Sequence, residues 1–177
     1  MKIYFVTSNR HKVEEAKKIL DIEIEQVKLD IKEIQSLDVK EVVKDKAKEA
    51  YAKLKKPVIV EDTGLYIKGW NGFPGALISW VVKSMGIKKL CKTIGRKRSA
   101  TAKACVAYYD GKNLKIFCGQ IKGRISKKPR GKKRFDWDRI FIPEGDTRTF
   151  AEMSLEEKNR ISHRVKAFRK FKRFLVR

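Results

Sequence analysis

The sequence predicts an α/β protein with a mixed central β-sheet flanked by helices. Strand-like apolar runs alternate with amphipathic helical patterns, which is typical of parallel strands connected through helices. Two β-rich runs joined by Asp110-Gly111 predict an antiparallel hairpin in the same protein. The chain has 177 residues, 42% of them hydrophobic, so we expect one domain, residues 1–177.

The first part of the chain predicts strands and helices in turn. Residues 2–6 predict a short buried strand, and after a polar turn at 7–9 the apolar residues return at helical spacing. Residues 22–31 alternate apolar and polar residues, as a strand does. Residues 39–54 predict a charged amphipathic helix that ends before Pro57, and the next strand begins at Val58.

The second part predicts the hairpin, two loops and a helical end. The β-rich runs cover 100–109 and 114–125, and a short strand follows at 140–142. Glycines predict loops over 69–75 and 126–134, with an apolar pattern resuming over 78–85. The last part is helical, because Ser154 and Glu157 fit a capping box and an apolar stripe follows: Val165, Phe168, Phe171 and Leu175.

The composition is strongly basic. There are 44 Lys and Arg against 21 Asp and Glu, a formal net charge of +23, and the excess runs along the whole chain. A solvated surface and a polyanionic partner such as nucleic acid explain this charge equally well.

The cysteines and the apolar runs indicate the compartment. Cys91, Cys105 and Cys118 include no CxxC pair, so we expect buried reduced thiols and no zinc site. We expect no signal peptide, because the first apolar run turns polar after Val6, and no apolar run approaches the roughly 18 residues of a membrane helix. We therefore expect a cytoplasmic protein that has no membrane partner.

The segment Thr7-Ser8-Asn9-Arg10-His11-Lys12 lies between a predicted strand and a predicted helix. Its backbone N–H groups, its hydroxyls and Lys12 suit a phosphate at a helix N-terminus. An ordinary N-cap by Ser8 or Asn9 is the simpler interpretation of the segment alone. The glycines of a P-loop are absent.

Two adjacent acids, Glu61 and Asp62, follow the apolar run 58–60. At least one must point into the crevice at the end of that predicted strand. A carboxylate there suits Mg²⁺, which bridges protein oxygens to substrate phosphates, and the other can activate water. Surface acids that pair with lysines are the alternative.

Two further groups suit a purine base. Phe135-Asp136-Trp137-Asp138 offers an aromatic face for stacking and carboxylates for ring N–H groups, although both aromatics can instead pack in the core. Ser162-His163-Arg164 lies at a helix junction near Lys158, where Arg164 suits a carbonyl such as purine O6. A structural role for His163 is the alternative.

In this order, the segments resemble the inosine triphosphate pyrophosphatase family, enzymes that cleanse the nucleotide pool of deaminated purines. The resemblance spans nearly the whole chain, and the ordered set is more specific than any one motif. The segments that carry it are TSNRHK (7–12), KEIQS (32–36), VIVEDTGL (58–65), NGFPG (71–75), DWDRIFIPEG (136–145), TFAEMSLEEKN (149–159) and ISHR (161–164).

The resemblance implies two lobes around a long nucleotide-binding cleft, a homodimer, and Mg²⁺-dependent hydrolysis of ITP, dITP or XTP to the monophosphate and pyrophosphate. It implies Glu33 and Asp62 as metal ligands, and Asp62 and Lys12 as catalytic residues. The substrate-binding residues that it implies are Thr7, Ser8, Asn9, Lys12, Lys48, Thr63, Phe135, Trp137, Asp138, Lys158, His163 and Arg164.

The chain departs from the family in the base loop. Where the family has glycine, Phe, glycine, aromatic, Asp and Pro, this chain has Arg134 to Arg139, so any positive φ at Arg134 or Asp136 carries strain. Leu77-Ile78 also replaces a common Tyr-Ser pair. A nucleic-acid-binding protein on the same scaffold and a pyrophosphatase with another base preference, such as a modified pyrimidine, remain alternatives.

Overall fold

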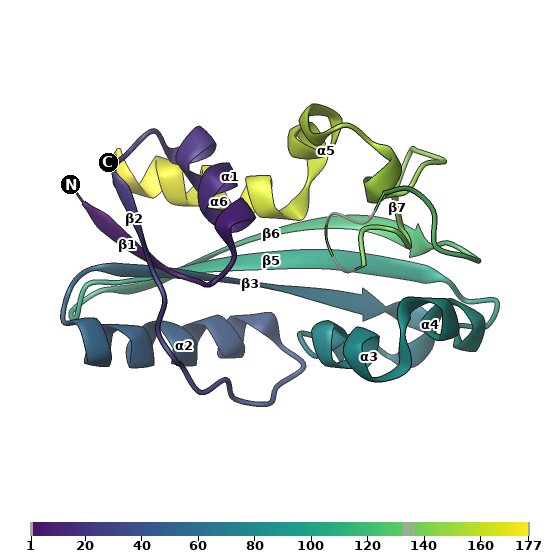
Figure 1. Ribbon diagram of the computed structural model, residues 1–177, viewed down its shortest axis with the longest axis horizontal. Coiled ribbons are helices and arrows are strands. Elements are labelled where there is room, and N and C mark those ends of the chain that lie inside the picture. Colours follow the sequence, from purple (N-terminus) through teal and green to yellow (C-terminus); the bar gives the residue numbers. More distant parts are fainter. Residues whose placement is uncertain (1, 133–134, 136, 177) are drawn as a thin grey trace.

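One sheet runs the length of the molecule between two layers of helices (Figure 1). The computed structural model describes residues 2–132, 135 and 137–176. Within these residues the strand order is β2-β1-β3-β5-β6-β7, with β4 paired to β3. The strands are β1 (Ile3–Val6), β2 (Ile24–Val27), β3 (Val58–Ile67), β4 (Pro74–Gly75), β5 (Ser99–Tyr109), β6 (Leu114–Ile125) and β7 (Phe141–Pro143).

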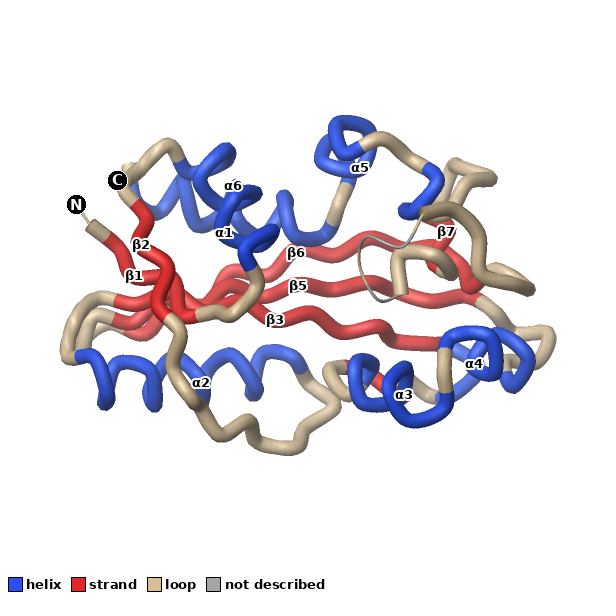
Figure 2. Tube along the Cα trace, viewed as in Figure 1, coloured by secondary structure: helices blue, strands red, loops and turns tan. Residues whose placement is uncertain are grey.

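The helices cover both faces of the sheet (Figure 2). Helices α1, α5 and α6 lie on one side, and α2, α3 and α4 lie on the other. Their bounds are α1 (Arg10–Leu20), α2 (Val39–Leu54), α3 (Ile78–Met85), α4 (Ile87–Thr93), α5 (Leu155–Ile161) and α6 (His163–Leu175), with short 3₁₀ turns η1 (Lys68–Trp70) and η2 (Phe150–Glu152). None of the described helices is long and apolar enough to cross a membrane.

The sheet is mixed, as predicted. Strand β1 pairs in parallel with β2 and β3, whereas β3, β5, β6 and β7 pair antiparallel. Strand β5 follows β3 over its whole length, but β1 reaches β3 only at Val58 and Ile59. One edge of β3 is therefore left unpaired over residues 60–64, between the carboxyl end of β1 and the short strand β4, which pairs at Leu65 and Tyr66.

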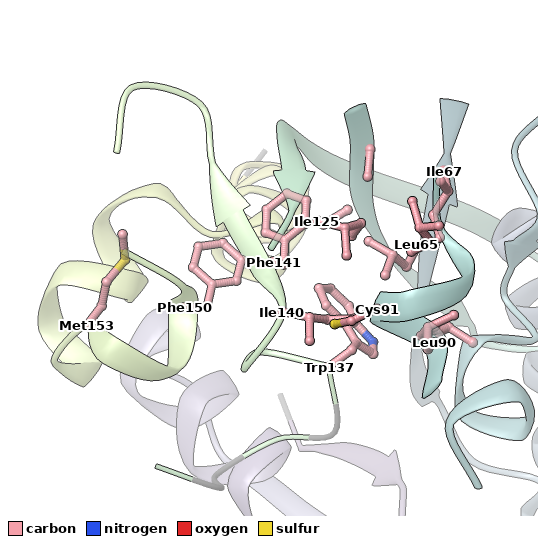
Figure 3. Packing of buried hydrophobic residues seen from close by; sticks show 14 residues of the cluster. Leu65, Ile67, Leu90, Cys91, Ile125, Trp137, Ile140, Phe141, Phe150 and Met153 are labelled. Atoms are coloured by element: carbon pink, nitrogen blue, oxygen red, sulfur yellow. The ribbon is translucent and has the colours of Figure 1, made fainter. Parts of the chain in front are cut away.

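Three apolar clusters hold the layers together. Ile59, Ala104 and Phe168 belong to the cluster between the sheet and helices α1 and α6. Val60 and Ala47 belong to the cluster between the sheet and α2. The third cluster joins the end of β3 and the start of β5 to α4, β7 and the 137–153 segment (Figure 3). Burial of such side chains contributes roughly 1.5–3 kcal/mol each.

The predicted elements match the structure closely at α2 and in the two hairpin strands. They differ at β2, which covers only Ile24–Val27 of the predicted 22–31, and in three further places. Strand β3 continues through Glu61 and Asp62 to Ile67, because β5 supplies hydrogen-bonding partners along its whole length. Helix α4 forms in the basic segment between Met85 and Ser99, where no helix was predicted. The hairpin turn has four residues, 110–113, and Asp110 accepts hydrogen bonds from the backbone of Lys112 and Asn113.

The prediction of three reduced cysteines is wrong for two of them. Cys105 and Cys118 form a disulfide, and Cys91 is free and buried. The hairpin register places Cys105 directly opposite Cys118, with Cα atoms 4.2 Å apart. That distance approaches the usual range for a disulfide, so the pairing register, not the sequence spacing alone, brings the thiols together.

Candidate active site

Two adjoining cavities meet at the loop after β1: the first lies beside β3, and the second lies between α1, α5 and the start of α6. The first has a volume of about 480 Å³, and the second of about 540 Å³. Asn9 and Phe135 line both cavities. The predicted site residues in the first are Thr7, Ser8, Asn9, Lys12, Glu33, Asp62, Thr63, Phe135 and Trp137, and those in the second are Asn9, Phe135, Asp138, Lys158 and Arg164.

The loop after β1 is held in shape by its own polar groups. Asn9 caps α1, since its side chain accepts a hydrogen bond from the Lys12 backbone N–H at 3.4 Å. The Asn9 N–H donates to Thr7 Oγ1 at 3.1 Å, and the Gln26 side chain donates to the Thr7 carbonyl at 2.9 Å. The cap interpretation is therefore right, and it leaves the helix N-terminus facing the first cavity.

Glu61 and Asp62 point to opposite faces of β3, because successive strand residues alternate. Glu61 is buried between two cations: Lys12 Nζ lies 2.7 Å from Oε2, and Arg164 Nε lies 3.1 Å from Oε1. Burial raises the pKa of Glu61, but the charges of Arg164 and Lys12 outweigh it and lower the pKa to about 2. Glu61 is therefore an anion that positions both cations.

Asp62 faces the first cavity with Glu33 and Lys46. Burial raises the pKa of Asp62, and Lys12 and Lys46 only partly oppose this shift. Burial lowers the pKa of Lys46, but the negative charges of Asp62 and Glu33 outweigh this effect, so the pKa of Lys46 is raised overall. Lys46 and Glu33 form an ion pair at the cavity edge.

Lys48 was predicted as the phosphate contact on the second helix, and the structure places it elsewhere. Lys48 is exposed and lines neither cavity, whereas Lys46 lines the first. The cause is helical periodicity: Lys46 lies three and four residues after Val43 and Val42, on the buried face of α2. That spacing was visible in the sequence and could have identified Lys46.

The second cavity is lined by cations next to an aromatic ring. Arg164 Cζ lies 5.1 Å from the centre of the Phe135 ring, and Lys158 Nζ lies 5.7 Å from it. Lys158 also forms a 2.5 Å ion pair with the buried Asp138. Burial raises the pKa of Asp138 despite the charge of Lys158.

Arg164 is linked through Glu61 to Lys12, which lines the first cavity. Its Nε donates to Glu61, and its Nη1 donates to Glu15 Oε2 at 2.9 Å. The buried Nη2 has no partner among the described residues, and neither has Asp138 Oδ1. One donor and one acceptor are thus buried and unpaired in residues that line the second cavity, and such groups are costly unless a ligand satisfies them. Sequence reasoning missed Glu15.

His163 and Trp137 are packed more deeply than a ligand-contacting role needs. His163 lines neither cavity, and it stacks on Trp137 and Phe150 with ring centres 5.4 and 6.0 Å away. Burial, then the charge of Arg164, lowers the pKa of His163, so the ring is neutral. Trp137 is buried in the core and also lines the first cavity. The predicted strain at Arg134 and Asp136 lies outside the described residues.

The carboxylates of the first cavity suit a hard divalent cation shared with a substrate. Among the described residues, no group of three or more His, Cys, Asp and Glu is placed to hold a metal ion by itself. Mg²⁺ is usually held by one or two carboxylates together with substrate phosphates. Glu33 and Asp62 fit that arrangement, because both line a cavity that also holds Lys12 and Lys46.

Comparisons with known proteins show which family the chain belongs to. The chain is 44% identical to a dITP/XTP pyrophosphatase of Thermococcus kodakarensis, covering 99% of this chain and 97% of that one. It is 43% identical to an inosine triphosphate pyrophosphatase of Yarrowia lipolytica, covering 99% and 96%. A HAM1 protein from Coxiella burnetii has a similar structure, with a TM-score of 0.86, 28% identity and coverage of 99% and 98%. Because residues 3–174 also match the Ham1 family profile, the chain belongs to the Ham1 family.

Proposed function

We propose that this protein hydrolyses deaminated purine nucleoside triphosphates, ITP, dITP and XTP, to the monophosphate and pyrophosphate. The observation that carries the proposal is the pair of adjoining cavities, one with cations and carboxylates for a triphosphate and one with cationic donors beside an aromatic ring. The relatives named as dITP/XTP and inosine triphosphate pyrophosphatases support it. Such hydrolysis removes damaged nucleotides from the nucleotide pool.

The first cavity would hold the triphosphate and a magnesium ion. Lys12, Lys46 and the N-terminus of α1 offer positive charge to the phosphates, with Thr7, Ser8 and Thr63 as hydroxyl donors. Glu33 and Asp62 would hold Mg²⁺, which when bound neutralises phosphate charge and makes the attacked phosphorus more electrophilic. Burial raises the pKa of Asp62, which makes its carboxylate a better acceptor for the proton of the attacking water.

The second cavity would bind the base against Phe135. Arg164 Nη2 is a buried donor that has no partner among the described residues, and it suits the O6 carbonyl that hypoxanthine and xanthine carry. Adenine presents an amino group at that position, so two donors would face each other and binding would be lost. Asp138 Oδ1 is an acceptor that no residue in the described part of the chain pairs with, and it suits a ring N–H.

A homodimer and a cytoplasmic location complete the proposal. The resemblance to the family suggests the dimer, and exposed apolar side chains offer a surface for it, among them Leu37, Phe73 and Trp80. Sedimentation analysis would test it, with a mass of 20.6 kDa contradicting the dimer. The cytoplasm is where such an enzyme meets its substrates.

Pyrophosphate release from ITP, XTP, ATP and GTP, with and without Mg²⁺, tests the function. We expect ITP and XTP to be hydrolysed well ahead of ATP and GTP, with no turnover in EDTA. Asp62→Asn should abolish turnover, and Asp45→Asn, on α2 outside both cavities, should not. Equal turnover of all four nucleotides, or faster turnover of a modified pyrimidine nucleotide, would contradict the proposed base preference.

A further inference from the structure

A third hollow lies away from the two nucleotide cavities. It has a volume of about 390 Å³, and none of its lining residues lines either of the other two. It forms where η1, the start of β5 and the end of β6 meet the turn after β7, at the end of the sheet opposite the β5-β6 turn (Figure 1). Its lining residues are Lys68, Ser99, Ala100, Thr101, Lys122, Gly123, Arg124, Glu144 and Gly145.

This groove is positively charged and its cations are not neutralised by neighbours. Lys68, Lys122 and Arg124 are exposed, and none of them makes an ion pair with a described residue. Among the described residues Glu144 is the one carboxylate in the lining, and Asp146, two positions on, is paired with Arg148. Ser99 and Thr101 add hydroxyl donors to the lining.

The sequence around the groove is almost free of acids. Between Asp62 and Asp136 the chain has nineteen lysines and arginines and a single acid, Asp110, which lies in the β5-β6 turn at the opposite end of the sheet. A surface stabilised by ion-pair networks would carry both signs of charge. The exposed cations of the chain segments that lead into β5 and out of β6 include Lys92, Arg96, Lys97, Lys127, Lys128 and Lys132. The charge therefore favours a polyanionic partner over a self-neutralised surface.

The surroundings of the groove indicate which polyanion fits. The large hydrophobic side chains that are exposed in the described chain are Ile34, Leu37, Phe73, Trp80, Leu155 and Val176, and none lines the groove. A membrane surface site would combine its basic residues with exposed apolar ones, and a single-strand site would present aromatic side chains for stacking. Lysine, arginine and hydroxyl donors alone are typical of contacts to a duplex backbone.

We propose that this groove and the cations around it bind the phosphate backbone of double-stranded nucleic acid without reading its sequence. Because no residue that lines the groove lines a nucleotide cavity, both nucleotide cavities stay accessible when nucleic acid is bound in the groove. Each phosphate neutralised by Lys or Arg releases counterions, which makes such binding steeply dependent on salt.

Fluorescence anisotropy of a labelled mixed-sequence DNA duplex of about 20 base pairs, titrated in EDTA at several KCl concentrations, tests the proposal. The variant Lys68→Gln/Lys122→Gln/Arg124→Gln removes three groove charges. The matched control Lys17→Gln/Lys112→Gln/Lys115→Gln removes three exposed charges from α1 and the far end of the hairpin. Both variants should hydrolyse ITP like the unmodified protein, which also shows that they fold.

We expect the groove variant to bind the duplex at least about tenfold more weakly at low salt. Its plot of log affinity against log salt concentration should flatten by about 2–3, because each lost phosphate contact removes about 0.9 from the slope. The control should change both quantities by much less. Equal losses in the two variants would overturn the proposal, because the binding would then follow net charge alone.

Two further outcomes would also overturn it. The first is no duplex binding by the unmodified protein at about 50 mM KCl. The second is tighter binding of phosphatidylserine-containing vesicles, or of a single strand of the same length, than of the duplex. The proposal would be supported if the unmodified protein binds the duplex more tightly than the vesicles and the single strand, and if the groove variant loses this binding while the control variant keeps it.

Discussion

Glu61 offers the sharpest test of how the buried charges hold this fold. The substitution Glu61→Gln keeps the size of the side chain and removes its charge, so Lys12 and Arg164 are left facing a neutral amide. The lowering of the Glu61 pKa from 4.5 to about 2 corresponds to about 3 kcal/mol of preference for the charged form. Breaking a buried ion pair by removing one partner typically costs about 3–5 kcal/mol.

The pH dependence follows from the direction of that shift. The pKa of Glu61 is lower in the folded than in the unfolded protein, so its stabilisation is present above about pH 4.5 and is lost as the pH falls toward 2. The difference in free energy of unfolding between the unmodified protein and Glu61→Gln should be about 3 kcal/mol at pH 7 and roughly half of that near pH 3.3.

Urea unfolding followed by circular dichroism between pH 3 and 7 measures this difference. Glu156→Gln, an exposed residue in the first turn of α5, is the matched control and should change stability by less than about 0.5 kcal/mol. A loss for Glu61→Gln that does not decline at low pH would refute the reasoning, because packing and not charge would then be its cause.

Three other predictions follow from the geometry. Lys46→Ala should lower kcat/KM for ITP by about tenfold or more, and Lys48→Ala should leave it unchanged, because, of these two lysines, Lys46 alone lines the first cavity. Steady-state kinetics of both variants would test this, and equal effects would contradict it. Arg98→Met should destabilise the fold by about 2–4 kcal/mol in urea unfolding, against little change for the exposed Arg96→Met, because the Arg98 guanidinium donates to the carbonyls of Cys91, Ile94, Ile125 and Ser126. Asp110→Asn should lower the Tm at pH 7, because hydrogen bonds from Asn113 and Lys112 lower the Asp110 pKa to about 2. This stabilisation is complete above about pH 4 and declines as the pH falls to about 2, so the Tm difference should shrink over that range; a difference that stays constant down to about pH 2 would argue against this.

Around the site, the features that were predicted best are those formed by residues close together in the sequence. The Asn9 cap and the Ser154 and Glu157 capping box need only residues three positions apart, and both are present in the structure. The helical spacing of apolar residues also predicted the full length of α2. The same spacing also points to Lys46, which was missed because the resemblance directed attention to Lys48.

Other parts of the site depend on strand pairing that no local pattern contains. The sequence suggested that a strand ends at Glu61 and Asp62, but these acids lie within β3, and the opening beside them exists because β1 ends early. The disulfide between Cys105 and Cys118 likewise follows from the hairpin register.

By itself, the sequence determined the alternation of strands and helices, the caps, the acids and cations available for a triphosphate, and the lack of acids between Asp62 and Asp136. Only the tertiary structure decided which of these residues meet. It placed Arg164 against Glu61, 103 residues earlier, and buried His163 in an aromatic stack away from both cavities. The physical reason is that periodicity and capping are local, whereas burial and ion pairing depend on which elements pack together.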